Sequence, residues 1–184
     1  MKRKNWPLRI VCALLFLFLS GLIMLSIYTL SSEDGAISGN RSQIVTEALK
    51  QEINEKIEST PEGFYLAERI KAKIIQYSPY GSDWHANVRK VGHFTIYFAL
   101  ASMAFITLAI LGVGKFMRIV LIIGFCSFFA YFDEMHQGQV VGRVMTHMDM
   151  FIDVLGACTS VALMTAISMM YSVIAWFGKF IFDH

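Results

Sequence analysis

The sequence predicts an all-α membrane protein, a four-helix transmembrane bundle with an extracytoplasmic amphipathic helical insertion. The chain has 184 residues, 55% of them hydrophobic, and the apolar residues form long runs rather than the short periodic stripes of a soluble domain. A hydrocarbon core about 30 Å thick requires roughly 20 apolar residues per helix, and four runs approach or exceed that length. A polar segment of mixed charge separates the first run from the other three.

The first run covers residues 10–30 and follows a short basic flank. A signal peptide also begins with basic residues, but its apolar core is only about 7–15 residues long and precedes a cleavage site of small residues. The longer run favours an uncleaved anchor, so residues 1–30 are predicted to form an N-terminal transmembrane anchor.

Residues 31–88 are predicted to form an extracytoplasmic segment of two amphipathic helices. Asn40 or Ser42 is a candidate cap for the first helix, in which Ile44, Ala48, Ile53 and Ile57 fall near one face. Thr60-Pro61 is typical of the start of the second helix, because Thr caps well and Pro suits the first turn. Phe64, Ala67, Ile70, Ile74 and Tyr77 then repeat at intervals of three and four, and the residues at 78–81 break the helix.

Residues 89–184 are predicted to hold three further transmembrane helices. Their apolar runs cover residues 92–113, 116–132 and 150–177. The middle run is short, and Asp133 with Glu134 is expected to end it. Cys12, Cys126 and Cys158 all lie in apolar runs, which indicates reduced, buried thiols.

The distribution of basic residues predicts the orientation. Lys and Arg accumulate on the cytoplasmic side of membrane proteins. The flank before the first run carries Lys2, Arg3, Lys4 and Arg9, the turn at 112–115 is followed by Arg118, and the tail carries Lys179. Both termini are therefore expected in the cytoplasm, with residues 31–88 and 133–149 outside.

This topology brings ionisable residues from three helix ends to one depth. Lys90, His93 and Tyr97 share one face of the second span, because they lie three and four residues apart. Asp133, Glu134 and Gln137 end the third span, and Arg143, Asp149 and Asp153 surround the start of the fourth. A charged Asp within a span costs about 2.5–3.5 kcal/mol at the centre and less near the interface, so Asp153 is expected to have a partner such as Arg143, Lys90 or His93. Taken singly, each group can be an interfacial ion pair or a helix cap, but together they indicate a functional pocket.

The same residues resemble the motifs of the VanZ-like family. Arg89-Lys90-Val91-Gly92-His93-Phe94 with Tyr97 resembles its RKxxHFxxY signature, and Asp133-Glu134 with Gln137 resembles its DExxQ motif. Gly142-Arg143, Asp149, Asp153 and Gly156 resemble its GR…D…DxxG segment. The family pattern often has an acidic residue close before the tyrosine, as in HFTEY, but here Thr95 is followed by Ile96, so that acid is absent. The resemblance implies a bacterial plasma-membrane protein of the cell envelope connected with teicoplanin resistance, but no reaction.

Two functions are favoured by this constellation. In the first, the protein binds an anionic lipid headgroup, a lipid-linked envelope precursor or a glycopeptide. Lys90 and Arg143 then hold phosphate or carboxylate, His93 and Gln137 form hydrogen bonds, Asp133 and Asp149 orient the cations, and Tyr97 lines the site. In the second, the protein is a membrane-embedded enzyme, with His93 as the general base and Glu134 or Asp153 orienting it.

The enzyme hypothesis has a metal-dependent variant. A divalent metal ion could bind among Asp133, Glu134, Asp149 and Asp153, since carboxylates suit Mg²⁺ or Mn²⁺. A third hypothesis is a structural or regulatory protein that meets partners through its helical insertion. The net charge of +2, without a basic cluster that alternates with aromatic residues, indicates no nucleic-acid partner.

Overall fold

The structure of this protein is a computed structural model, which describes residues 6–78 and 80–182. Lys2, Arg3 and Lys4, on which the predicted orientation partly rests, lie outside the described residues, as do Pro79 and the side chain of Lys179. Over the described residues the chain forms helices α1 (Trp6–Ser31), α2 (Gly35–Lys56), α3 (Pro61–Tyr77), α4 (Trp84–Ile110), α5 (Lys115–Gln137) and α6 (His147–Phe182).

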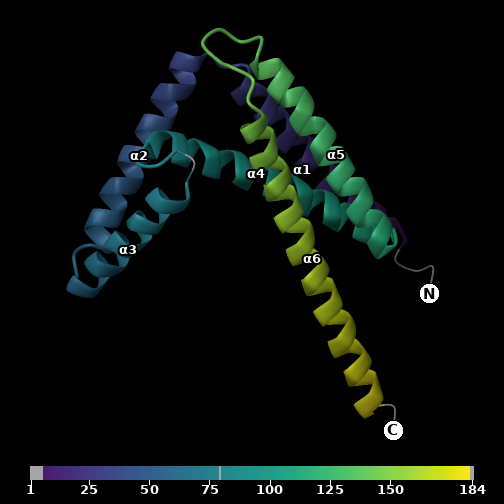
Figure 1. Ribbon diagram of the computed structural model, residues 1–184. Helices are drawn as coiled ribbons and strands as arrows, with labels where there is room; N and C mark the ends of the chain where they lie inside the picture. The colour runs from purple at the N-terminus through teal and green to yellow at the C-terminus, as the bar shows by residue number, and fades with distance from the viewer. Residues whose placement is uncertain (1–5, 79, 183–184) are drawn as a thin grey trace.

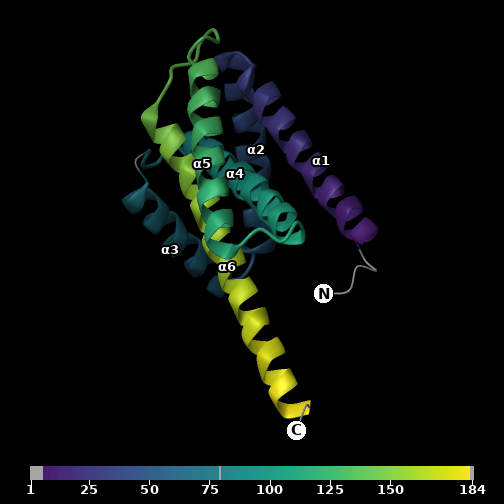
Figure 2. The same ribbon diagram turned by 90° about the vertical axis from the view of Figure 1, so that its right-hand side faces the viewer.

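Four of these helices, α1, α4, α5 and α6, are long and apolar enough to cross a membrane, which confirms the predicted all-α class with four spans. Helix α4 lies at the centre and packs against α1, α5 and α6. The α1–α2 turn and the α5–α6 loop lie at one end of the bundle, and the α4–α5 turn lies at the other (Figures 1 and 2). The distal half of α6 extends beyond the other helices in both views.

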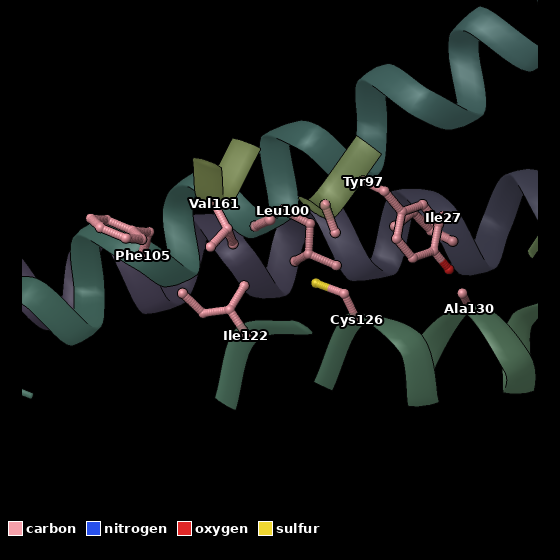
Figure 3. Packing of buried hydrophobic residues seen from close by; sticks show 10 residues of the cluster. Ile27, Tyr97, Leu100, Phe105, Ile122, Cys126, Ala130 and Val161 are labelled. Carbon is pink, nitrogen blue, oxygen red and sulfur yellow. The ribbon is translucent and has the colours of Figure 1, made fainter. Parts of the chain in front are cut away.

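The core of the bundle is a narrow apolar seam between the four spanning helices (Figure 3). Leu100 and Cys126 are fully buried. The three cysteines are free thiols, as predicted, but Cys12 and Cys158 are only half-buried rather than buried, because they lie toward the outside of the narrow seam. Tyr97 lies at one end of the seam and is also fully buried. The apolar seam therefore ends where the polar residues of α4 begin.

Helices α4 and α6 approach closely because both carry small residues at their crossing. A Cβ atom added to Gly156 would lie 2.3 Å from the backbone oxygen of Phe94, so only glycine fits there. One turn further on, the hydroxyls of Ser102 and Ser160 share a buried hydrogen bond of 2.8 Å. The Gly156–Ser160 pair thus serves helix packing, the role that small residues four apart often have in membranes.

Helices α2 and α3 form a hairpin that diverges from the spanning bundle (Figure 1). Thr60 caps α3 as predicted, since its hydroxyl accepts a hydrogen bond from the Gly63 amide and Pro61 begins the helix. The predicted caps of α2 were wrong. The helix starts earlier, at Gly35, because the Asp34 carboxylate accepts a hydrogen bond of 2.8 Å from the Ile37 amide.

The third span extends beyond the apolar run, which ends before Asp133. Helix α5 continues through Asp133 and Glu134 to Gln137. Both acids are buried, but each receives a hydrogen bond, Asp133 from Ser31 and Glu134 from the Thr146 amide. Because these acids have partners from other segments, they do not terminate the helix.

The α1–α2 turn and the α5–α6 loop are joined to each other. The Gly35 amide donates a hydrogen bond of 3.0 Å to the Val141 carbonyl. A Cβ on Gly35 would lie 2.2 Å from the Gly142 oxygen, and Gly142 itself has a φ of 75° that favours glycine. The start of the hairpin and the entry to α6 are therefore held together by backbone contact.

Candidate functional site

All nine residues predicted for the site lie at the end of the bundle where these two connections meet. Lys90, His93 and Tyr97 come from α4 and Asp133, Glu134 and Gln137 from α5; Arg143 comes from the loop and Asp149 and Asp153 from α6. The structure connects them into separate hydrogen-bonded groups rather than into a single cluster.

The first group is a buried ion pair between α4 and α6. The Lys90 ammonium donates to a carboxylate oxygen of Asp149, and both side chains are 8% exposed. The ammonium also lies 5.3 Å from the centre of the Tyr80 ring. The charge of Lys90 is therefore neutralised within the protein, and Lys90 is not a free cation that could bind a ligand anion.

The second group places an imidazole on a fully buried carboxylate. His93 Nδ1 lies 3.1 Å from Asp153 Oδ1, and the Asp153 side chain has no exposed surface. The arrangement fixes the ring and leaves Nε2 as the nitrogen available for other contacts. His93 is the partner of Asp153, out of the three candidates that the sequence offered.

The third group runs from α1 through α5 to the α5–α6 loop. Asp133 accepts hydrogen bonds from Ser31 Oγ at 2.5 Å and from Gln137 Nε2 at 2.9 Å. Gln137 Oε1 in turn accepts from Arg143 Nη1 at 2.9 Å, and Arg143 Nη2 donates to the Leu30 carbonyl at 3.0 Å. The Arg143 guanidinium is thus oriented by neutral oxygens and has no direct carboxylate partner among the described residues.

Glu134 has a different position from the other acids. It is fully buried, and its Oε1 accepts a hydrogen bond of 2.6 Å from the Thr146 amide. The Thr146 hydroxyl accepts from the Asp149 amide at 3.2 Å and so caps α6. Glu134 therefore supports the start of α6.

A pocket of about 230 Å³ opens between α1, α2, α4 and the α5–α6 loop. Of the nine predicted residues, four line it, namely His93, Tyr97, Asp133 and Arg143. The other five, Lys90, Glu134, Gln137, Asp149 and Asp153, are buried and do not line it. The remaining wall is largely apolar and is formed by residues that include Ile27, Leu30, Val45, Val88 and Ile96.

Sequence reasoning missed two cations of this pocket, Arg41 and Arg89. Arg41 of α2 pairs with Glu33, which also lines the pocket. Arg89 is exposed and forms no hydrogen bond or ion pair with any described residue. Arg89 directly precedes Lys90 in the motif, so the motif could have indicated Arg89 as a candidate. No pattern in residues 31–88 indicated Arg41.

The charges around Arg143 are unbalanced. Burial lowers the pKa of the Arg143 guanidinium below its ordinary value, and the nearby positive charge of Arg89 lowers it further. The nearby charges of Glu33, Asp133 and Glu134 offset only part of this lowering, and Glu33 is itself paired with Arg41. An anion between the two guanidinium groups would stabilise both.

Three buried polar atoms at this end have no hydrogen-bond partner among the described residues, namely Tyr97 Oη, Glu134 Oε2 and Asp153 Oδ2. Unsatisfied buried polar atoms are rare in native proteins and often mark bound water or a functional role. Of the two further histidines, His136 contacts the Ser32 hydroxyl at 3.0 Å, and His147 is an exposed residue at the start of α6.

The four carboxylates proposed for a metal ion do not gather around one point. Asp149 pairs with Lys90, Asp153 with His93, and Asp133 with Ser31 and Gln137. Within the described part of the chain, no three His, Cys, Asp or Glu side chains form a group suited to a metal ion.

The fold and site together define a small membrane protein with four spanning helices, a helical hairpin and a cationic pocket at one end of the bundle. The VanZ/LLP1 family model matches residues 16–170, and the chain belongs to that family. The matched range includes most of α1 and the whole hairpin as well as the motif-bearing helices. No curated protein and no solved structure matches the chain.

Proposed function

We propose that this protein binds the anionic headgroup of an envelope lipid, a lipid-linked precursor or another cell-wall ligand in the pocket between α1, α2 and α4. The observation that carries the proposal is that Arg89 and Arg143 line one pocket and neither has a carboxylate partner among the described residues. Guanidinium groups bind phosphate and carboxylate through parallel hydrogen bonds, which a lysine ammonium does not reproduce.

The apolar part of the pocket wall supports a ligand with a hydrocarbon portion. Ligand sites usually combine an apolar lining with a few placed polar groups, and here Leu30, Val45 and Ile96 supply the lining. In contrast to the interpretation from sequence, the cation that would accompany Arg143 is Arg89 rather than Lys90, because Asp149 neutralises Lys90. His93 and Tyr97 complete the wall as hydrogen-bonding groups.

The proposal also includes the location of the protein. The excess of basic residues at Arg9, Lys115 and Arg118 supports a cytoplasmic position for that end of the bundle in a bacterial plasma membrane. The pocket then opens on the outer side, where cell-wall precursors and glycopeptides are found. A contribution to teicoplanin resistance is the cellular role that this placement and the family make worth testing.

Binding of phosphatidylglycerol to the purified protein tests the proposal, with native mass spectrometry in a mild detergent as the measurement. The substitution Arg89→Gln removes a cation without breaking any hydrogen bond of the described residues. Loss of one charge-assisted contact, worth about 1.5–3 kcal/mol, should weaken binding about tenfold or more. Arg143→Gln should weaken it as well, but it also removes the bonds to Gln137 and Leu30.

The matched control is Arg69→Gln, which replaces an exposed arginine of α3 that does not line this pocket. It should leave the affinity within about twofold of the native value, because distant surface charges are screened by salt. Equal losses with Arg69→Gln and Arg89→Gln would show a nonspecific charge effect and contradict the proposal.

The His93–Asp153 pair favours a second candidate function, an enzyme that acts on a lipid-linked phosphate ester. A histidine that is oriented by a buried carboxylate and lines a pocket with two arginines that lack a carboxylate partner has the parts of a general base beside an anion-binding site. His93 Nε2 would take a proton from water as the water attacks the terminal phosphorus of a lipid diphosphate. The bond from that phosphorus to the bridging oxygen would break, so that the lipid monophosphate departs and inorganic phosphate is released.

For this second function, release of phosphate from a polyprenyl diphosphate by the purified protein is the measurement. His93→Gln should lower the rate by about 10²–10⁴-fold if His93 is the base. Asp153→Asn should lower the rate and shift its pH profile, whereas Arg69→Gln should do neither. Tight lipid binding without any phosphate release would contradict the enzymatic function and leave binding as the remaining proposal.

A further inference from the structure

A second pocket, of about 430 Å³, lies within the helical hairpin. Its walls come from α2, α3 and the start of α4. On α2 and the residue that follows it, Leu49, Ile53 and Ile57 line the pocket at helical spacing, and on α3 Ala67, Ile70 and Ile74 do the same. Two amphipathic helices thus face each other across a space that their side chains do not fill.

The two lysines that line this pocket are paired with carboxylates. Lys71 donates to Glu58 at 2.5 Å and to Glu68 at 3.1 Å, and these two carboxylates raise the pKa of Lys71. Lys50 pairs with Glu47 at 3.0 Å. Among the described residues, the pocket therefore offers aliphatic surface and no unpaired cation, which suits a hydrocarbon chain better than a charged peptide.

The hairpin pocket adjoins the cationic pocket along α2 and α4. Val88 lines both, one residue before Arg89. On α2, Val45 lines the cationic pocket, and the next residue, Thr46, lines the hairpin pocket. An amphiphile with its anionic group at Arg89 would have an apolar space directly beside that group.

We propose that the hairpin pocket holds a hydrocarbon chain of the same ligand whose anionic headgroup binds at Arg89 and Arg143. This inference rests on the proposed function and narrows it, because it makes the ligand a lipid rather than a soluble glycopeptide or a free phosphate. The hairpin then acts as a chain-binding module, in which α2 contributes to both halves of the site.

Photolabelling of the native protein tests the proposal directly. A phosphatidylglycerol that carries a diazirine near the end of one acyl chain is mixed as a minor component into phosphatidylcholine vesicles that contain the full-length protein. After irradiation, mass spectrometry should find label on peptides that include Leu49, Ile53 and Ile70. Label confined to the spanning helices would overturn the proposal, since the chain would then lie in the bilayer.

A chain-length comparison with a matched pair of variants provides the second test. Ala67→Phe fills the hairpin pocket, since Ala67 lines it and is only 6% exposed. Ala72→Phe places the same ring on an exposed position of α3 outside the pocket. Dioleoyl-phosphatidylglycerol should bind the native protein and Ala72→Phe about tenfold or more tightly than it binds Ala67→Phe. Dihexanoyl-phosphatidylglycerol should bind all three with affinities within about twofold of one another.

The outcomes separate this inference from the proposed function. Equal affinity of the native protein for the two lipids would overturn the chain site, whether or not Ala67→Phe folds, and a continued dependence on Arg89 would preserve the headgroup site. If Arg89→Gln changes the binding of neither lipid and the chain label still reaches the hairpin, the headgroup assignment is wrong.

Discussion

Asp149→Asn should destabilise the protein by about 3–5 kcal/mol, because it leaves the Lys90 ammonium buried without its counterion. Lys90 has one further contact among the described residues, with the Tyr80 ring, and an aromatic face offsets only part of that loss. The measurement is the unfolding midpoint of the purified protein in detergent. We expect this loss even though the substitution keeps the side-chain size and lies outside the wall of the cationic pocket.

Two further variants decide whether the effect comes from the ion pair. Lys90→Met combined with Asp149→Leu should recover most of the stability, since apolar replacement of a buried pair is often neutral or favourable. Glu47→Gln removes the partner of Lys50 in an exposed pair, with side chains 48% and 58% exposed, and should cost less than about 1 kcal/mol. If Asp149→Asn costs no more than Glu47→Gln, Lys90 and Asp149 do not form a buried pair.

Gly156→Ala should destabilise the crossing of α4 and α6 by about 1–3 kcal/mol, the usual range for an overpacked core. The new Cβ would lie 2.3 Å from the Phe94 carbonyl oxygen, and this atom belongs to the backbone of α4 and cannot rotate away. The two helices must therefore separate, which also stretches the Ser102–Ser160 hydrogen bond. Thermal unfolding in detergent measures the change.

The control, Gly124→Ala, should act in the opposite direction. Gly124 lies within α5, and nothing lies within 4 Å of the position that its Cβ would occupy. Alanine is favoured over glycine in a helix by about 1 kcal/mol, so this variant should be as stable as the native protein or more stable. A stabilising Gly156→Ala would contradict the close approach of α4 and α6.

The spanning helices could be predicted from sequence because hydrocarbon thickness sets a required length of apolar chain. Their ends were less predictable, since an end depends on partners that come from distant segments. Asp133 and Glu134 suggested a helix end, but Ser31 and Thr146 satisfy them and α5 continues. The start of α2 was misplaced for a more local reason, because Asp34 was overlooked as a cap in favour of Asn40 and Ser42.

The sequence places the nine candidate residues at one end of the bundle, which is where they lie in the structure, but it does not determine how their charges pair. Residue spacing shows that Lys90 and His93 share a helix face. It does not show that Asp149 pairs with Lys90 and Asp153 with His93. The contribution of Arg41 to the pocket could not be predicted from residue spacing either, because it depends on how the hairpin returns to α4.

The contact between Gly35 and Val141, together with the bond from Arg143 to Leu30, has a consequence for how a ligand is received. The Gly35–Val141 bond holds the start of the hairpin to the α5–α6 loop, and the Arg143–Leu30 bond holds that loop to α1, so the binding site is shaped in advance. Advance shaping spares a ligand the entropic penalty of ordering mobile segments. No segment then has to close around the bound ligand. Selectivity among amphiphiles comes from the shape that the pocket already has in the ligand-free protein.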